Sequence, residues 1–254
     1  MDFFWSAPPV ARTLTAATLI ESVLVYGQVL GGGRIVYLPK RIFLKFPPEL
    51  WRIASGFCLT GPDLQCLFDL YNLWRYSSAL ELESVRFPRP GDFFIYVLFV
   101  SIVIQLTAGL YFGFVSFLPA LIMALIWTYA QEKRGTKVTF FVITIPVMYL
   151  PATMLCFTLI RGGWPGVLLE CTGILAAHLY DFLTRIYPTY GGGRNFISTP
   201  LFVQRFFYKH TPNVGSRGYG TAYQAPPSSV SQGRTSGFNA GSRWGSWGSG
   251  RRLG

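Results

Sequence analysis

Charge is scarce in this 254-residue sequence, and its scarcity excludes an ordinary soluble protein. Charged residues make up 13% of the chain, against 51% hydrophobic and 17% aromatic residues, whereas soluble domains carry about 25% charged residues. Acidic residues are rarest near the carboxyl end: none follows Asp181, while nine lysines and arginines do. The composition therefore indicates a membrane protein with a basic carboxyl-terminal segment, which positive-inside bias and anionic lipid both favour on the cytosolic side.

Residues for metal or redox chemistry are also few. The chain has two histidines and four cysteines, and Cys58 and Cys66 are too far apart for a zinc pair. All four cysteines (Cys58, Cys66, Cys156 and Cys171) lie in apolar surroundings, which predicts buried free thiols. No P-loop or other nucleotide motif occurs. We expect no metal and no cofactor.

The amino terminus, MDFFWSAPPVARTL, lacks the features of a signal peptide. It begins acidic, contains two prolines and has no small-residue cleavage site after a short apolar core. The first apolar segment is therefore expected to be retained as a membrane helix.

Apolar segments that approach the length of a membrane helix, about 20 residues, occur six times. Their ranges are about 9–30, 52–76, 92–111, 114–130, 138–160 and 165–187. Polar residues interrupt the second, and Pro146 and Pro151 should kink the fifth, so both are predicted to lie inside a bundle. The prediction is an all-α membrane domain of six transmembrane helices over residues 1–188.

The placement of lysine and arginine orients this domain. With the amino terminus in the cytosol, the cytosolic segments carry 16 of the 22 basic residues. The loop at 31–50 opposes this orientation with four of the other six, but the short loop QEKRGTK and the tail support it. We expect both termini in the cytosol. The first loop is so apolar that it should lie partly in the interface, with its Trp and Tyr at headgroup level.

Residues 189–211 predict a juxtamembrane amphipathic segment. Ser198 and Thr199 before Pro200 are a helix-start signal. One face of the helix would gather Leu201, Phe202, Phe206 and Phe207, and Arg205 and Lys209 would reach toward headgroups. Residues 212–254, rich in Gly, Ser and Arg, cannot bury enough apolar surface to offset their ordering entropy, so a disordered cytosolic tail is expected.

Several motifs together resemble the Derlin family, relatives of rhomboid proteases without proteolytic activity. They are PPVAR at 8–12, WR at 51–52, LWRY at 73–76, FPRPGDF at 87–93, AAHLYDFLTRIYP at 176–188 and STPLFVQRFF at 198–207. One position departs from the family, whose G-x-x-x-G before the sixth-helix histidine reads Gly173 to Ala177 here. Small residues at this spacing still permit close helix packing.

The resemblance implies a rhomboid-like fold in the endoplasmic reticulum membrane and a part in ubiquitin-dependent degradation. Misfolded luminal or membrane proteins would be moved to the cytosol, in association with an ubiquitin-ligase complex. A general lipid-perturbing membrane adaptor without its own conduit is a third interpretation. A homo-oligomer is a further expectation, and neither substrate nor ligase can be specified from the residues.

An active rhomboid protease is the alternative from a different class. Its chemistry needs a serine in a Gly-x-Ser-Gly loop and a histidine on the sixth helix within hydrogen-bond reach. His178 stands near the expected place, but no GxSG occurs in the chain, and Ser116 lacks the flanking glycines. His178 is instead expected to hydrogen-bond inside the bundle, with Asp181 as its partner.

The WR pair, Trp51 and Arg52, has two interpretations. One is an interfacial aromatic with a snorkelling arginine. The other, favoured by the resemblance, is an anchor for the first loop, because a guanidinium can donate to several carbonyls at once.

Polar residues at membrane depth also leave two interpretations open. They are Glu21, Asp69, Asn72, Gln105 and Glu170. They could satisfy one another inside the bundle, or they could line a hydrophilic cavity that lowers the cost of passing a polar polypeptide. The short fourth helix is compatible with local membrane thinning.

The last residues, WGSGRRLG, are similar to the SHP box that binds the amino-terminal domain of the valosin-containing AAA ATPase. Trp247 and Leu253 would fill apolar pockets. Gly248 and Gly250 would let the backbone approach a sheet edge, and Arg251 and Arg252, before the terminal Gly254, would steer toward an acidic surface. An RNA- or lipid-binding Arg/Gly tail is less favoured because no RGG repeat occurs, so no nucleic-acid partner is expected.

Overall fold

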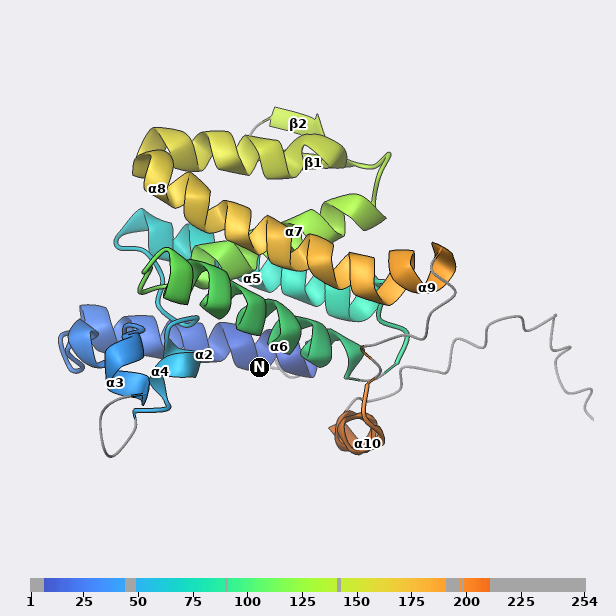
Figure 1. The fold of residues 1–254 in the computed structure, drawn as a ribbon. Helices are drawn as coiled ribbons and strands as arrows, with labels where there is room; N and C mark the ends of the chain where they lie inside the picture. The colour runs from blue at the N-terminus through green and yellow to red at the C-terminus, as the bar shows by residue number, and fades with distance from the viewer. Residues whose placement is uncertain are drawn as a thin grey trace, which may run out of the picture. The chain divides into compact units, whose positions relative to one another are not determined.

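The computed structural model describes residues 7–43, 49–89, 91–140, 143–190, 197 and 199–210, which belong to one compact unit within Met1–Asn213 (Figure 1). The predicted tail, 212–254, lies outside the described residues, and the ATPase-binding box lies outside them too. Within the described part the fold is mostly helical, with one small hairpin.

The helices that build the bundle are α2 (Pro9–Tyr26), α5 (Leu64–Glu83), α6 (Asp92–Ile104), α7 (Leu118–Glu132) and α8 (Leu150–Asp181). Shorter helical segments are η1 (Gly32–Arg34), α3 (Pro39–Phe43), α4 (Arg52–Ser55), η2 (Gln105–Tyr111), η3 (Val147–Tyr149), η4 (Phe182–Ile186), α9 (Tyr187–Tyr190) and α10 (Leu201–His210). The strands are β1 (Lys137–Phe140) and β2 (Ile143–Pro146).

The third predicted segment matches the structure from end to end, because α6 and the π-helical η2 together cover Asp92–Tyr111. The second was wrong at its start. The chain forms only the short α4 there, and the long helix α5 begins at Leu64. Pro62 cannot continue a helix, and Asp63 has a φ of 54°, outside the right-handed helical region.

The fifth predicted helix was wrong over its first part, where residues 137–140 and 143–146 pair as antiparallel strands. Val138 pairs with Ile145 and Thr139 with Thr144. The segment is rich in β-branched and aromatic residues, which favour strands. Consequently Pro146 ends a strand and Pro151 lies in the first turn of α8, where a missing N–H costs no hydrogen bond. Neither proline kinks a helix interior.

The helix α8 is two antiparallel arms joined at Gly163, visible as the sharp bend in Figure 1. Gly163 has a φ of 65° and a ψ of −165°, a conformation essentially restricted to glycine. Pro165 then lies in the first turn of the second arm, a favoured position for proline. These arms correspond to the fifth and sixth predicted segments.

The centre of the bundle is α7, which is buried nearly all the way around. Ten of its residues are buried, against α5, α6 and both arms of α8. The helix has 15 residues and so spans roughly 22 Å. A helix that is apolar on every side belongs inside a bundle, so α7 fixes where the others pack.

Two helical stretches in the described part are long and apolar enough to cross a membrane, Asp92–Tyr111 and Val147–Tyr190. Their outward faces are apolar as well: exposed side chains include Leu98, Ile102, Leu106, Leu110, Leu159, Ile160, Trp164 and Leu175. Outward apolar side chains on spanning-length helices are typical of a membrane protein.

Candidate functional site

Arg52 is the deepest charged group in the described structure and ties the first loop to the bundle. Its side chain is 1% exposed. Nη1 donates to the carbonyl oxygens of Gly33, at 3.0 Å, and Val36, at 2.7 Å, and Nε pairs with Glu49. One guanidinium therefore satisfies two loop carbonyls and a carboxylate.

The aromatic residues of the first loop divide into an exposed and a buried set. Trp51 is 59% exposed, and its indole N–H donates to the Arg34 carbonyl at 3.3 Å. Tyr37, in contrast, is buried and packs edge-on against Phe117, with ring centroids 5.0 Å apart. The Tyr37 ring is seated against Gly109, where a Cβ would approach within 2.7 Å of it. Placement of the loop's Trp and Tyr at headgroup level stays a prediction.

The second arm of α8 approaches α7 closely at Gly173. A Cβ at this position would lie 1.9 Å from the Ala120 carbonyl oxygen. One turn on, Ala177 is 2% exposed. Small residues at this spacing let the two backbones touch.

His178 and Asp181 do not pair, contrary to the prediction. The His178 side chain is on an exposed face of α8 and makes no hydrogen bond or ion pair among the described residues. Asp181 instead accepts through Oδ1 from Arg86 at 3.1 Å and from Arg185 at 3.3 Å. The two residues are three apart, and the packing of α8 turns one outward and the other toward the loop before α6.

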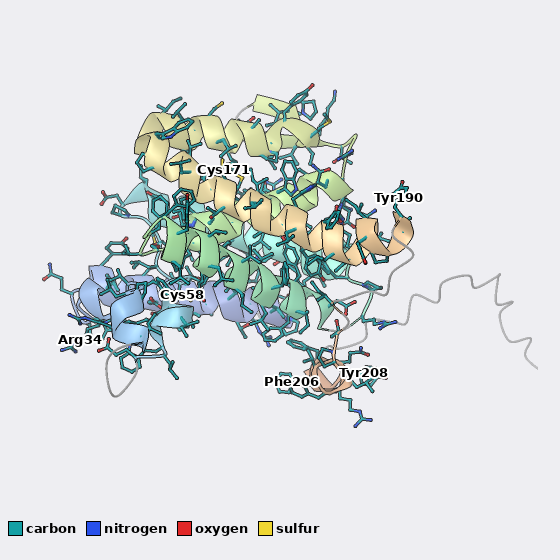
Figure 2. The ribbon with its side chains drawn as sticks, in the orientation of Figure 1. Arg34, Cys58, Cys171, Tyr190, Phe206 and Tyr208 are labelled. Carbon is teal, nitrogen blue, oxygen red and sulfur yellow. The ribbon has the colours of Figure 1, made fainter. Side chains whose placement is uncertain are left out.

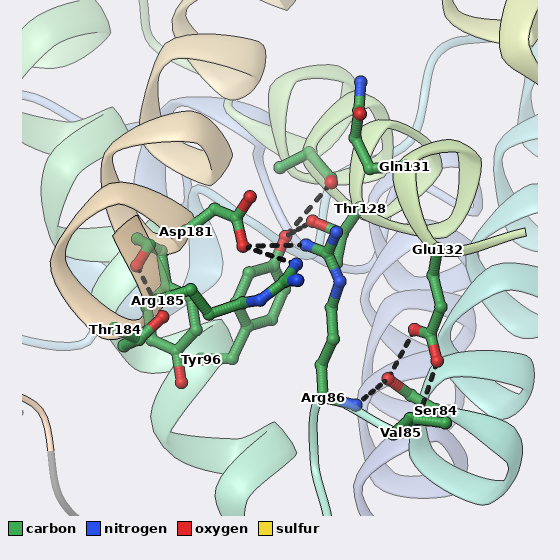
Figure 3. Close-up of polar contacts among 12 residues, drawn as sticks. Ser84, Val85, Arg86, Tyr96, Thr128, Gln131, Glu132, Asp181, Thr184 and Arg185 are labelled. Carbon is green, nitrogen blue, oxygen red and sulfur yellow. Dashed lines mark hydrogen bonds and ion pairs between the residues drawn. The ribbon is translucent and has the colours of Figure 1, made fainter. Parts of the chain in front are cut away.

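The contact of Arg86 with Asp181 belongs to a polar network at one end of the bundle (Figure 3). Burial lowers the pKa of the Arg86 guanidinium, and the neighbouring Asp181 carboxylate opposes that shift; arginine stays charged at neutral pH in any case. Nearby, Glu132 accepts from Ser84 Oγ and from the Val85 N–H, both at 2.6 Å. The network joins the ends of α5, α7 and α8.

This network was not predicted from the sequence, although its residues lie in or beside two of the motifs that resemble the family. Arg86 directly precedes FPRPGDF, and Asp181 and Arg185 lie in the AAHLYDFLTRIYP motif. The signal that could have indicated this network is the position of these charged residues, with Arg86 close to a Pro–Gly turn and Asp181 and Arg185 near the end of a predicted helix. Their pairing spans 95 residues, and no local pattern encodes it.

A second missed contact is a helix cap supplied from far along the chain. The Glu81 carboxylate accepts from the backbone N–H groups of Val10, at 3.0 Å, and Ala11, at 2.7 Å. These are orphan donors at the start of α2, where a negative charge is favourable. The contact fixes the beginning of α2 beside the end of α5.

The residues of the predicted hydrophilic cavity are brought together in part. Asp69, Asn72 and Glu170 are buried and line a cavity of about 20 Å³ with Thr158 and Arg161. Thr158 donates to Glu170 Oε1 at 2.5 Å, and Asp69 accepts from the Gly61 N–H at 3.1 Å. The volume suits about one water molecule. We call Asp69, Asn72, Thr158, Arg161 and Glu170 the mid-bundle polar cluster.

Some carboxylate oxygens in the bundle lack a partner among the described residues: Glu170 Oε2 and Glu21 Oε1 are buried without one.

Gln105 does not belong to the cluster, which corrects the prediction. It is the first residue of η2, and its side-chain amide donates to the carbonyl of Ile53, in α4, at 2.5 Å.

The described residues contain neither the serine–histidine pair of a protease nor a cluster that could bind a metal. Ser116 Oγ donates to the Leu59 carbonyl at 3.3 Å, not to a histidine. The described residues contain no cluster of three His, Cys, Asp or Glu side chains that could hold a metal. The four cysteines are free, as expected, but the expectation that they are buried was wrong: Cys58 and Cys66 are half-buried, and Cys156 and Cys171 are exposed. Figure 2 labels Cys58 and Cys171.

The amphipathic segment forms α10, with its faces divided differently from the prediction. Val203 is buried, and both Val203 and Phe207 face Gly91, while Phe207 also packs against Phe94. Leu201, Phe202, Phe206 and Tyr208 are exposed, and Figure 2 shows Phe206 and Tyr208 projecting from the helix. Phe207 therefore holds α10 to the bundle instead of sharing the outward face.

Fold and site together define a helical membrane protein in which buried polar side chains hold loops and helix ends in place. Its described side chains include no hydrogen-bonded serine–histidine pair. The model of the Der1-like family matches residues 7–201. Derlin-1 of Mus musculus and Derlin-1 of Homo sapiens are each 33% identical over 258 residues, covering 100% of this chain and 97% of theirs. Derlin-1 of Arabidopsis thaliana is 26% identical over 208 residues, covering 80% of this chain and 76% of its own.

The chain belongs to the Der1-like family. The matched range contains the Arg52 anchor, the mid-bundle polar cluster and the network around Asp181. It ends at the start of α10, so α10 beyond residue 201 and the tail are not part of the family match.

Proposed function

We propose that this protein is a non-catalytic, six-span component of the endoplasmic reticulum membrane that serves in the degradation of misfolded proteins. It helps luminal or membrane substrates cross to the cytosol as part of a complex with an ubiquitin ligase. Within that complex the chain can assemble with further copies of itself. The single observation that carries the proposal is membership of the Der1-like family, with similarity to Derlin-1 over the whole chain.

The contacts at the helix ends support six alternating spans. Glu81 joins the start of α2 to the end of α5, and Arg86 joins the α5–α6 loop to the end of α8. Lys133 at the end of α7 pairs with Glu83 at 3.3 Å. These termini therefore share one end of the bundle, and α10 packs there too, against Gly91 and Phe94. We assign this end to the cytosol, because positive residues favour that side.

The central helix gives the proposal a physical mechanism. At roughly 22 Å, α7 is shorter than the hydrocarbon core of about 30 Å. Because α7 is enclosed by the other helices, thinning of the bilayer by hydrophobic mismatch would arise at the lipid-facing helices packed around it. The mid-bundle polar cluster lies beside α7, where Pro119, Ile122 and Ile126 also line its cavity. A thinned membrane next to buried polar groups lowers the barrier for a polar polypeptide.

Energy for extraction would come from a partner, the valosin-containing AAA ATPase, recruited through residues 247–254. Trp247 and Leu253 supply the apolar anchors, and the segment from 212 onward supplies reach. This step rests on the sequence pattern, since these residues lie outside the described structure.

The test is replacement of the protein in cells that lack it. Cells expressing the full chain should degrade a misfolded luminal reporter with a normal half-life, whereas cells without it should accumulate the reporter inside the organelle. Equal reporter half-lives with and without the protein would contradict the proposal. The alternative, an active rhomboid serine protease, is tested by a fluorophosphonate probe in detergent, where covalent labelling of this chain would establish it and overturn the non-catalytic assignment.

A further inference from the structure

A cavity of about 240 Å³ opens at the end of the bundle that carries α10. Its walls come from the α5–α6 loop, the last turns of α8, η4 and the residues before α10. Three arginines line it: Arg86, Arg89 and Arg185. The volume is a little below that of typical pockets for drug-sized ligands, about 300–1,000 Å³, and suits a small polar group.

Among the residues that line the cavity, arginines outnumber carboxylates; Glu132, outside the cavity wall, also lies near enough to favour the charged form of Arg86. Arg86 and Arg185 share a single oxygen, Oδ1 of Asp181. Asp92 also lines the cavity, but its carboxylate is occupied by the Arg89 backbone N–H at 3.0 Å and by the Thr199 hydroxyl. The guanidinium of Arg89 is exposed and has no partner among the described residues. Three cations therefore face two anions around one cavity.

Arg86 distinguishes this cavity from a patch of surface charge, because its guanidinium is largely buried. Its side chain is 14% exposed, and a guanidinium has five N–H donors. Among the described residues, the structure shows one side-chain hydrogen bond from it, between Nη1 and Asp181. The other donors are available to a ligand in the cavity, held in place by a contact that already fixes the guanidinium. A planar guanidinium pair is suited to phosphate oxygens.

The surroundings indicate that the phosphate is attached to an apolar molecule. Tyr180 and Phe87 form part of the cavity wall. On the outer face of the helix that carries Asp181 and Arg185, the apolar side chains of Leu179, Phe182 and Ile186 are exposed. These three side chains do not line the cavity, but they place this end of the helix in apolar surroundings. A headgroup in the cavity would therefore sit at the edge of the apolar layer, where cytosolic anionic lipid is found.

We propose that this cavity binds the phosphate of an anionic membrane lipid, with Arg86, Arg89 and Arg185 as donors. The phosphate site rests on the charges and the cavity, whereas its assignment to a lipid also rests on the cytosolic placement of this end in the proposed function. A soluble phosphate ester offers the same oxygens, so the experiment has to separate the two sources.

The experiment titrates the purified full chain in detergent with dioctanoyl phosphatidic acid, measured by isothermal calorimetry. Dioctanoyl phosphatidylcholine and glycerol 3-phosphate serve as comparison ligands. We expect saturable binding of the phosphatidic acid, and weaker binding of both comparison ligands. Glycerol 3-phosphate binding as tightly as the lipid would overturn the lipid assignment in favour of a soluble ester. The absence of saturable binding by any of the three would overturn the site.

Arg89→Gln and Arg185→Gln test the residues without removing the buried Arg86. Each variant should weaken phosphatidic acid binding roughly tenfold, as expected for loss of one hydrogen bond to a charged group. The matched control is Arg134→Gln, which removes an exposed arginine that does not line the cavity, and binding should change less than twofold. Unchanged affinity in both site variants, or an equal loss in the control, would overturn the proposal. Circular dichroism and thermal midpoints must match in all three.

Discussion

The backbone of Gly173 in α8 lies against the Ala120 carbonyl in α7, so close that a Cβ at 173 would come within 1.9 Å of that oxygen. The atom it would meet belongs to the backbone of the most buried helix, which cannot move aside as a side chain could. The contact sets how near the two helices approach.

Gly173→Ala should therefore destabilise the bundle by about 1–3 kcal/mol, the usual cost of overpacking. The measurement is thermal unfolding of the full chain in detergent, together with the fraction that elutes as a single species. Gly162→Ala is the control, because its nearest neighbour is a Thr158 methyl at 4.0 Å. Equal midpoints for both variants would show that the approach of α7 and α8 relaxes without cost.

Arg52→Ala should destabilise the protein strongly, by about 3–5 kcal/mol, since it removes one partner of the buried ion pair with Glu49. The Gly33 and Val36 carbonyls lose their donor at the same time. Arg52→Lys should restore only part of this, because an ammonium lacks the planar fork. Unfolding midpoints and proteolysis of the first loop report the effect. Arg41→Ala removes an exposed arginine of the same loop, and its midpoint should match that of the unsubstituted chain.

Asn72→Leu tests whether the mid-bundle polar cluster serves transport. Its side chain donates to the Phe68 carbonyl of its own helix at 2.8 Å, and polar contacts in membrane bundles contribute about 0.6 kcal/mol on average. The variant should fold but lengthen the half-life of a misfolded luminal reporter. Gln105→Leu, outside the cluster, should not. Normal degradation by a folded Asn72→Leu protein would remove this residue from the mechanism.

Gly91→Ala should release α10 from the bundle. Gly91 has a φ of 88°, and a Cβ there would lie 2.9 Å from Val203 and 3.0 Å from Phe207. Trypsin should cleave faster at Arg205 while the rest of the chain stays folded. Gly113→Ala is a matched control for backbone strain, since its φ is 74° but nothing lies within 4 Å. If both variants leave cleavage at Arg205 unchanged, α10 is not held by this contact.

Removal of residues 247–254 should abolish co-purification of the ATPase while the thermal midpoint of the membrane domain stays the same. Trp247→Ala and Leu253→Ala should each reproduce most of the loss, as expected for anchor residues. Deletion of residues 225–232 removes the same length of tail without touching the motif, and should preserve recruitment. Undiminished co-purification after loss of 247–254 would mean that the ATPase binds elsewhere.

The sequence located most of the elements because membrane insertion depends on local composition. A run such as 92–111 is apolar along its whole length, so both its existence and its ends were predictable. The strand pair 137–140 and 143–146 was not predictable in this way. It is as apolar as a membrane helix, and its β-branched residues favour strands only where a partner strand is available to pair with them.

The sequence by itself determined that the chain is a low-charge, basic-tailed membrane protein with the motifs of its family. It named Arg52, Gly173 and Asp181 as candidates from residue type and motif. Only the tertiary structure decided their partners: loop carbonyls for Arg52, a backbone oxygen of α7 for Gly173, and two arginines in place of His178 for Asp181. Hydropathy is a property of a segment, whereas a buried polar contact depends on which segments pack together, often many residues apart.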